Sequence, residues 1–151
     1  MLDLFTWYRR NLVETELYDP RGNRVRFLET DFVHLIKMTN RYGDEPKNAR
    51  MTIEQIKSGR IQLVAGRFDA QRAQELCHAR TIACEPWRIV PNWQPLGRAN
   101  PGEAYIKNIG ADNDPIYRVL ICGVEGRARR PVTIFPREGF SAKHLAGQLW
   151  P

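Results

Sequence analysis

The sequence has no apolar run of about 20 residues, the length that a helix needs to cross a bilayer. It also has no GxxxxGK, GxGxxG, HExxH or GxSxG motif, which removes the usual signatures of phosphate-loop, dinucleotide-binding, zinc-protease and α/β-hydrolase sites. Carboxylates do not cluster, and the pairs Asp31 with Asp69 and Asp112 with Asp114 suit caps and turns better than ion binding. We therefore expect neither a metal nor another cofactor.

The amino terminus, MLDLFTWYRR, lacks the features of a secretory signal. It has no basic region ahead of an apolar segment and no small-residue cleavage site. This pattern predicts a cytoplasmic location, with delivery into a target cell as the alternative.

Cysteine is scarce, and its three copies do not form a recognisable site. Cys77 and Cys84 are seven residues apart, a spacing that fits neither a zinc knuckle nor a redox pair, and Cys122 stands alone. All three have apolar neighbours, so we expect them to be small buried hydrophobic residues.

The composition is that of one soluble globular domain. The chain has 151 residues, of which 42% are hydrophobic and 26% charged, enough for a core without metals or disulfides. Its net charge is +6, and within 116–137 only Glu125 opposes a group of arginines: Arg118, Arg127, Arg129, Arg130 and Arg137. Such a patch predicts a nucleic acid as the partner, through phosphate contacts. The alternative is a solvated hairpin tip at EGRARR.

The first half of the chain has mainly helical patterns. Apolar spacing predicts helices over 3–13, from Thr30 or Asp31 to Met38, over 51–60, and from Asp69 to Pro86. Between the first two lies a hairpin over 16–28, whose DPRGN segment supplies turn residues.

The second half has mainly strand patterns. Strands are predicted at 87–90, 104–109, 115–124 and 131–136, and a final helix over 141–149 is expected to cap the domain. Helices followed by strands predict an α+β fold with an antiparallel sheet.

Four residues are candidates for chemistry. His34 lies on a predicted helix and carries an imidazole, the kind of group that takes or gives a proton in catalysis, although a lone histidine is more often structural. Tyr105 and Lys107 share one face of a strand, where they offer a hydroxyl or ring and a cation to a phosphate, unless that face is simply solvated. Thr133 is either a strand-forming residue or a hydroxyl for a phosphate oxygen.

The order of motifs resembles the nuclease domains of phages and polymorphic toxins that are grouped with barnase, EndoU, colicin-type and RelE-like ribonucleases. The resemblance covers about 16–136 of the single domain 1–151, and its motifs are Y-D-P-x-G-x-x-V-x-F, the helix with His34, T-I-x-x-x-P-W-x-I-V, Y-x-K, and V-T-x-F. It implies N-terminal helices packed on a curved antiparallel sheet of about four strands, and metal-independent RNA cleavage by attack of the ribose 2′-hydroxyl.

The resemblance also implies roles for individual residues. His34 would transfer a proton, Lys107 would neutralise charge on the phosphorane, Thr133 would position a phosphate oxygen, and Tyr105 would stack on a base or assist. The candidates for binding the RNA substrate are Arg80, Arg88, Arg118 and Lys37. The positive charge further predicts an acidic partner, which for a toxin is an immunity or antitoxin protein. The competing hypothesis is a non-catalytic basic module that binds nucleic acid or protein.

Overall fold

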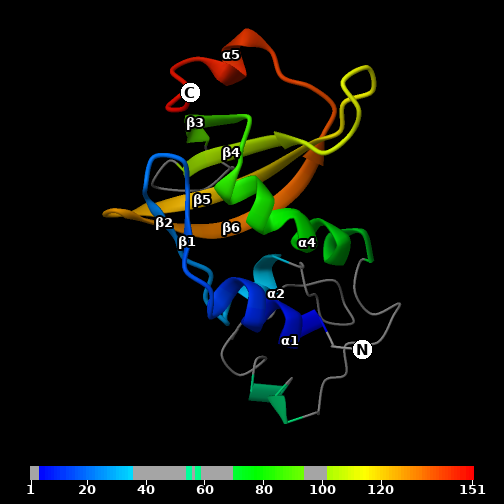
Figure 1. The fold of residues 1–151 in the computed structure, drawn as a ribbon, viewed down its shortest axis with the longest axis vertical. Coiled ribbons are helices and arrows are strands. Elements are labelled where there is room, and N and C mark those ends of the chain that lie inside the picture. Colours follow the sequence, from blue (N-terminus) through cyan, green and yellow to red (C-terminus); the bar gives the residue numbers. More distant parts are fainter. Residues whose placement is uncertain (1–3, 36–53, 56, 59–69, 94–101) are drawn as a thin grey trace.

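The computed structural model describes residues 4–35, 54–55, 57–58, 70–93 and 102–151. A curved six-stranded sheet forms its centre, and helices pack against it, so the class is α+β as predicted (Figure 1). The strands are β1 (Leu17–Tyr18), β2 (Arg24–Val25), β3 (Arg88–Trp93), β4 (Gly102–Asn108), β5 (Tyr117–Glu125) and β6 (Ala128–Arg137). Their order across the sheet is β1-β2-β6-β5-β4-β3.

Strands β3 to β6 form an antiparallel meander whose side chains alternate between two faces. Residues opposite each other on neighbouring strands share a face. Two adjacent rows show the alternation: Tyr105, Leu120 and Ile134 form one, and Ala104, Ile121 and Thr133 form the next. Both faces are covered, which explains why β4 is buried on successive residues.

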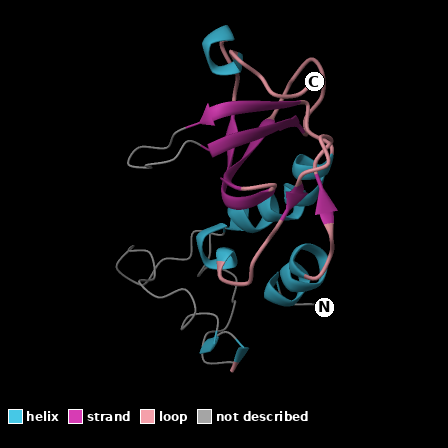
Figure 2. Ribbon diagram, turned by 90° about the vertical axis from the view of Figure 1, so that its left-hand side faces the viewer, coloured by secondary structure: helices cyan, strands magenta, loops and turns pink. Residues whose placement is uncertain are grey.

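Helices cover one face of the sheet. They are α1 (Leu4–Tyr8), a π-helical turn η1 (Arg9–Val13), α2 (Asp31–Leu35) and α4 (Ala70–Cys84). On α4, Leu76, Ala79 and Ile82 recur every three residues and are fully buried against this face. Figure 2 shows these helices on one side of the strands.

The C-terminal segment covers the other face. Phe140 and Leu145, the latter on α5 (Ala142–Leu145), pack on a smaller apolar cluster formed by β3, β4 and β5. The helix expected over 141–149 is thus present only as α5, which is four residues long. Beyond it the chain runs to the sheet edge, where the Ile89 amide donates to the Trp150 carbonyl at 3.0 Å.

The predicted hairpin is present, but its strands join the sheet. Asp19 shapes the turn because its Oδ1 accepts the amides of Arg21 and Asn23, and Gly22 adopts a φ of +85°. β2 then pairs in parallel with β6, so the sheet has six strands instead of about four, and one pairing is not antiparallel. The figure of about four strands was implied by the resemblance, and the sequence offered no signal against it, because a parallel contact between distant segments leaves no local pattern.

Several boundaries differ from expectation. β3 continues through Pro91 to Trp93, and β6 begins at Ala128, inside the expected EGRARR tip. Cys122 is buried as predicted, whereas Cys77 is exposed. The expected helix over 51–60 and the end of the helix at Met38 lie largely or wholly outside the described residues. Within the described residues, no helix is both long enough and apolar enough to span a bilayer.

Candidate nucleic-acid interface

The sheet register separates the residues predicted to form a catalytic site. Tyr105 and Lys107 are two apart on β4, so both point to the face that α4 covers. Thr133 pairs with Ile121 and belongs to the opposite face. The expectation that Thr133 shares a concave face with the other two is therefore wrong, and one phosphate group cannot contact Thr133 and Lys107 from the same face of the sheet.

Tyr105 lies in the core. Its side chain is fully buried, and its hydroxyl donates to Asp19 Oδ2 at 2.6 Å and accepts from Arg21 Nη2 at 3.1 Å. Burial, followed by the electrostatic effect of Cys122 and the hydrogen bond to Asp19, raises the pKa of Tyr105 well above its usual value. A ring in this position is not available to stack on a base, which corrects the role expected for it.

Around Tyr105 lies a buried ion cluster, which we define as Asp19, Arg21, Glu103 and Arg129. Arg21 Nη2 is 2.8 Å from both Asp19 Oδ2 and Glu103 Oε2, and Arg129 Nε is 2.8 Å from Glu103 Oε2. Burial opposes ionisation of the two carboxyls, but hydrogen bonds from Tyr105 and Arg21 to Asp19, and from Arg21 and Arg129 to Glu103, lower both pKa values. The cluster ties the β1-β2 hairpin to β4 and β6.

His34 is exposed and lies on a different part of the molecule from Lys107. Its helix α2 is anchored where Asp31 pairs with Arg130, at 2.9 Å, on β6. Lys107 is level with Pro136, which is six residues further along that strand, or about 20 Å. The structure thus places the two residues at separate ends of the sheet.

Lys107 lies at the carboxyl end of α4. Its Nζ donates to the Glu85 carbonyl at 2.6 Å, a favourable place for a cation because carbonyls at a helix end lack helical partners. Arg118 is its neighbour across β4 and β5, and Arg118 Nε is buried with no hydrogen-bond partner in the described part of the chain. Two predicted phosphate-binding residues are therefore adjacent.

Aromatic rings continue from this point across the end of the sheet. The ring centroids of Trp87 and Tyr117 are 5.6 Å apart, and those of Tyr117 and Phe140 are 5.3 Å apart. The guanidinium carbons of Arg88 and Arg137 lie 4.5 Å and 5.2 Å from the ring centroids of Trp87 and Phe140. We call this group the aromatic-basic surface: Trp87, Arg88, Lys107, Tyr117, Arg137 and Phe140.

The local sequence explains why Trp87 stands here. Pro86 follows the end of α4, and the Trp87 amide donates to the Ile106 carbonyl at 2.6 Å, which fixes the indole beside β4. Trp87 stays 37% exposed, which is unusual for a residue of this size. The ring is therefore held at the surface, between the Arg88 guanidinium and Tyr117, with part of it open to solvent.

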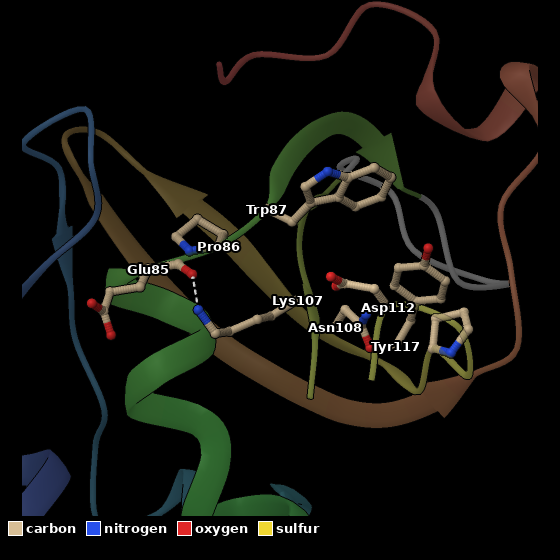
Figure 3. A pocket seen from close by; sticks show the side chains of 8 residues that line it. Glu85, Pro86, Trp87, Lys107, Asn108, Asp112 and Tyr117 are labelled. Carbon is tan, nitrogen blue, oxygen red and sulfur yellow. Dashed lines mark hydrogen bonds between the residues drawn. The ribbon is translucent and has the colours of Figure 1, made fainter. Parts of the chain in front are cut away.

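A cavity of about 380 Å³ opens beside these rings (Figure 3). Its lining comes from the end of α4, β4, the 109–116 loop and β5, and consists of Glu85, Pro86, Trp87, Lys107, Asn108, Asp112, Pro115 and Tyr117. The loop is held by Asn108, whose Oδ1 accepts the amides of Gly110 and Ile116, both at 2.9 Å. The cavity therefore combines aromatic walls with charged and amide groups.

The remaining predicted binding residues are dispersed. Arg88 belongs to the aromatic-basic surface and Arg118 lies next to Lys107, whereas Arg80 is exposed on α4. Lys37 lies outside the described residues. Tyr117 and Phe140 were not predicted to bind a ligand, although the sequence carries a signal for both: an aromatic residue beside or near an arginine, in IYR and REGF.

Comparison with protein-family models, with curated proteins and with solved structures finds no match to this chain.

Proposed function

We propose that the protein binds single-stranded RNA at the aromatic-basic surface. The observation that carries the proposal is the row of Trp87, Tyr117 and Phe140, with arginines over two of its rings and Lys107 lining the cavity beside Trp87 and Tyr117. Trp87 is exposed, and Tyr117 and Phe140 are partly buried against the sheet. Exposed ring surface stacks on unpaired bases, and cations beside it follow the phosphates. The net charge of +6 adds long-range attraction for a polyanion.

Single strands suit this surface better than duplexes do. Stacking on a side chain requires a base whose face is free, and paired bases inside a helix do not offer one. The surface also presents its cations and rings at the end of a sheet and not along a helix that could enter a groove. We therefore expect a strong preference for unpaired RNA over the same sequence in a duplex.

The test measures the affinity of purified protein for a fluorescent uridine-rich 12-nucleotide RNA by anisotropy, across a series of salt concentrations. Trp87→Ala is expected to weaken binding by about 1–3 kcal/mol, the usual contribution of one stacked base. Tyr18→Ala is the matched control, because Tyr18 is also an exposed aromatic residue but lies on the β1-β2 hairpin. Equal losses in the two variants would contradict the proposal.

Two arginine variants show where the phosphates of the RNA bind. Arg88→Gln is expected to weaken binding and to make its salt dependence shallower by about one unit of log–log slope. Arg127→Gln removes an exposed arginine at the β5-β6 turn and is expected to change neither. If instead Arg127→Gln weakened binding and Arg88→Gln did not, the RNA would bind at the β5-β6 turn.

Metal-independent cleavage of the bound RNA is the second candidate, as the resemblance to toxin nucleases implies. A base removes the 2′-hydroxyl proton, O2′ bonds to phosphorus, and the 5′-oxygen leaves with a proton, which yields a 2′,3′-cyclic phosphate. Lys107, which lines the cavity, would stabilise the phosphorane charge. His144 favours this candidate because Nε2 lies 3.1 Å from Arg137 on the aromatic-basic surface, and its ring is 6.4 Å from Phe140.

Incubation of the protein with RNA in EDTA tests cleavage, with cyclic-phosphate ends as the readout. We expect Lys107→Met to reduce the rate. His34→Ala and His144→Ala separate the two histidines: loss in the second alone assigns proton transfer to the C-terminal segment, and loss in the first alone assigns it to α2. Intact RNA at high protein concentration would leave binding as the function.

A further inference from the structure

The cavity beside Trp87 holds polar groups that RNA binding by stacking and charge does not use. We propose that this cavity binds one guanine base of the RNA, with Asn108, Asp112 and Lys107 as the groups that recognise it. This inference rests on the proposed RNA binding and adds base selectivity to it. A volume of about 380 Å³ lies at the lower end of the range of small-molecule sites, as suits a single nucleoside.

Asn108 presents a hydrogen-bond donor to the cavity. Its Oδ1 already accepts the amides of Gly110 and Ile116, so the orientation of its side-chain amide is fixed. Both hydrogens of Nδ2 remain, since no described residue accepts a hydrogen bond from this atom. The loop therefore holds a preorganised donor without any change of conformation.

Lys107 and Asp112 complete the set of polar groups that would recognise the base. Lys107 Nζ uses one of its three hydrogens for the Glu85 carbonyl and keeps two. Figure 3 shows the Asp112 carboxylate directed into the space between Lys107, Trp87 and Tyr117. An ionised carboxylate only accepts, so the cavity offers donors on Asn108 and Lys107 and an acceptor on Asp112.

Guanine complements this arrangement better than the other bases do. It is the only common base with two adjacent donors, N1–H and the N2 amino group, which one carboxylate accepts together. Its O6 and N7 are acceptors for the amide and the ammonium, and lysine is one of the two side chains that most often contact these atoms of guanine. Adenine, cytosine and uracil each present at most one donor group on the matching edge, so they leave part of the set unpaired.

The test compares 12-nucleotide RNAs that are identical except for one central base in a uridine background. Wild-type protein is expected to bind the guanine-containing RNA about tenfold more tightly than those with adenine, cytosine or uracil. Asp112→Asn is expected to abolish most of that preference while the protein still binds the all-uridine RNA. Asp114→Asn is the matched control, because Asp114 is exposed in the same loop but does not line the cavity.

A second variant keeps the loop folded. Asn108→Asp preserves the oxygen that accepts the two amides and replaces only the Nδ2 donor, so it is expected to lower the guanine preference without unfolding the loop. The ratio of affinities is the readout, because it cancels the general repulsion from the added charge. Equal affinity for the four RNAs, or a preference for another base, overturns the inference while RNA binding stands. Failure to bind any of the four overturns RNA binding itself.

Discussion

The buried ion cluster and the aromatic-basic surface use the same kinds of residue for opposite purposes. Both combine arginines with tyrosine, and β4 and β6 contribute to each. In the cluster, Arg21 and Arg129 are paired with carboxylates and withdrawn from solvent. In the surface, Arg88 and Arg137 lie over rings.

The difference comes from the partners that the fold supplies. A guanidinium beside two carboxylates has its charge balanced, and an incoming phosphate would have to displace them. A guanidinium over a ring retains its charge and keeps donors for another ligand. The number of arginines in a segment therefore does not predict where a polyanion binds. The arginines that lack a neighbouring carboxylate are the better candidates.

The largest effect should come from breaking the cluster at Glu103. Glu103→Ala leaves the buried Arg129 and the partly buried Arg21 without their shared carboxylate. We expect a loss of about 3–5 kcal/mol in the free energy of unfolding, measured by urea denaturation. Glu125→Ala is the control, because Glu125 is exposed and lies 3.7 Å from Arg130, where a loss below about 1 kcal/mol is expected. Similar losses would show that the cluster is not a structural unit.

Acid should remove the stabilisation that the same ion cluster contributes. The pKa values of Asp19 and Glu103 are lowered in the fold from ordinary values of 3.8 and 4.5. Below those values the unfolded chain binds more protons than the folded one, so stability rises with pH there. The stabilisation is present above about pH 4.5 and is lost as pH falls through the lowered pKa values.

Urea midpoints between pH 7 and pH 2 measure this loss. In Glu103→Gln the decline below pH 4.5 is expected to be smaller, because one of the two carboxyls no longer titrates. An unchanged pH profile in that variant would mean that other carboxyls cause the acid sensitivity.

The sequence predicted the meander and most of the helices because these depend on local periodicity. The strand around Tyr105 was found from alternation, and the hairpin turn from DPRGN. The parallel contact between β2 and β6 joins segments a hundred residues apart, and no spacing reports it.

The site was harder to predict than the fold for the same reason. Which face Thr133 takes depends on a register shift between Ile121 and Cys122 in the β5-β6 pairing, which periodicity alone does not reveal. Tyr105 and Lys107 were correctly placed on one face of β4. Although they are only two residues apart, the Tyr105 hydroxyl is buried in the core, whereas Lys107 lines the cavity. The aromatic row draws Trp87, Tyr117 and Phe140 from three segments, so it exists only after folding.

Tyr105→Phe gives the smallest effect and the cleanest separation of the two regions. The variant loses the hydroxyl that donates to Asp19, but that carboxylate keeps Arg21 and two backbone amides as donors. We expect a stability loss of about 1–2 kcal/mol and an unchanged affinity for RNA. Trp87→Ala should do the reverse, since its ring is exposed. A loss of RNA affinity in the folded Tyr105→Phe protein would mean that the buried ion cluster contributes to RNA binding. The two regions would then not have separate roles.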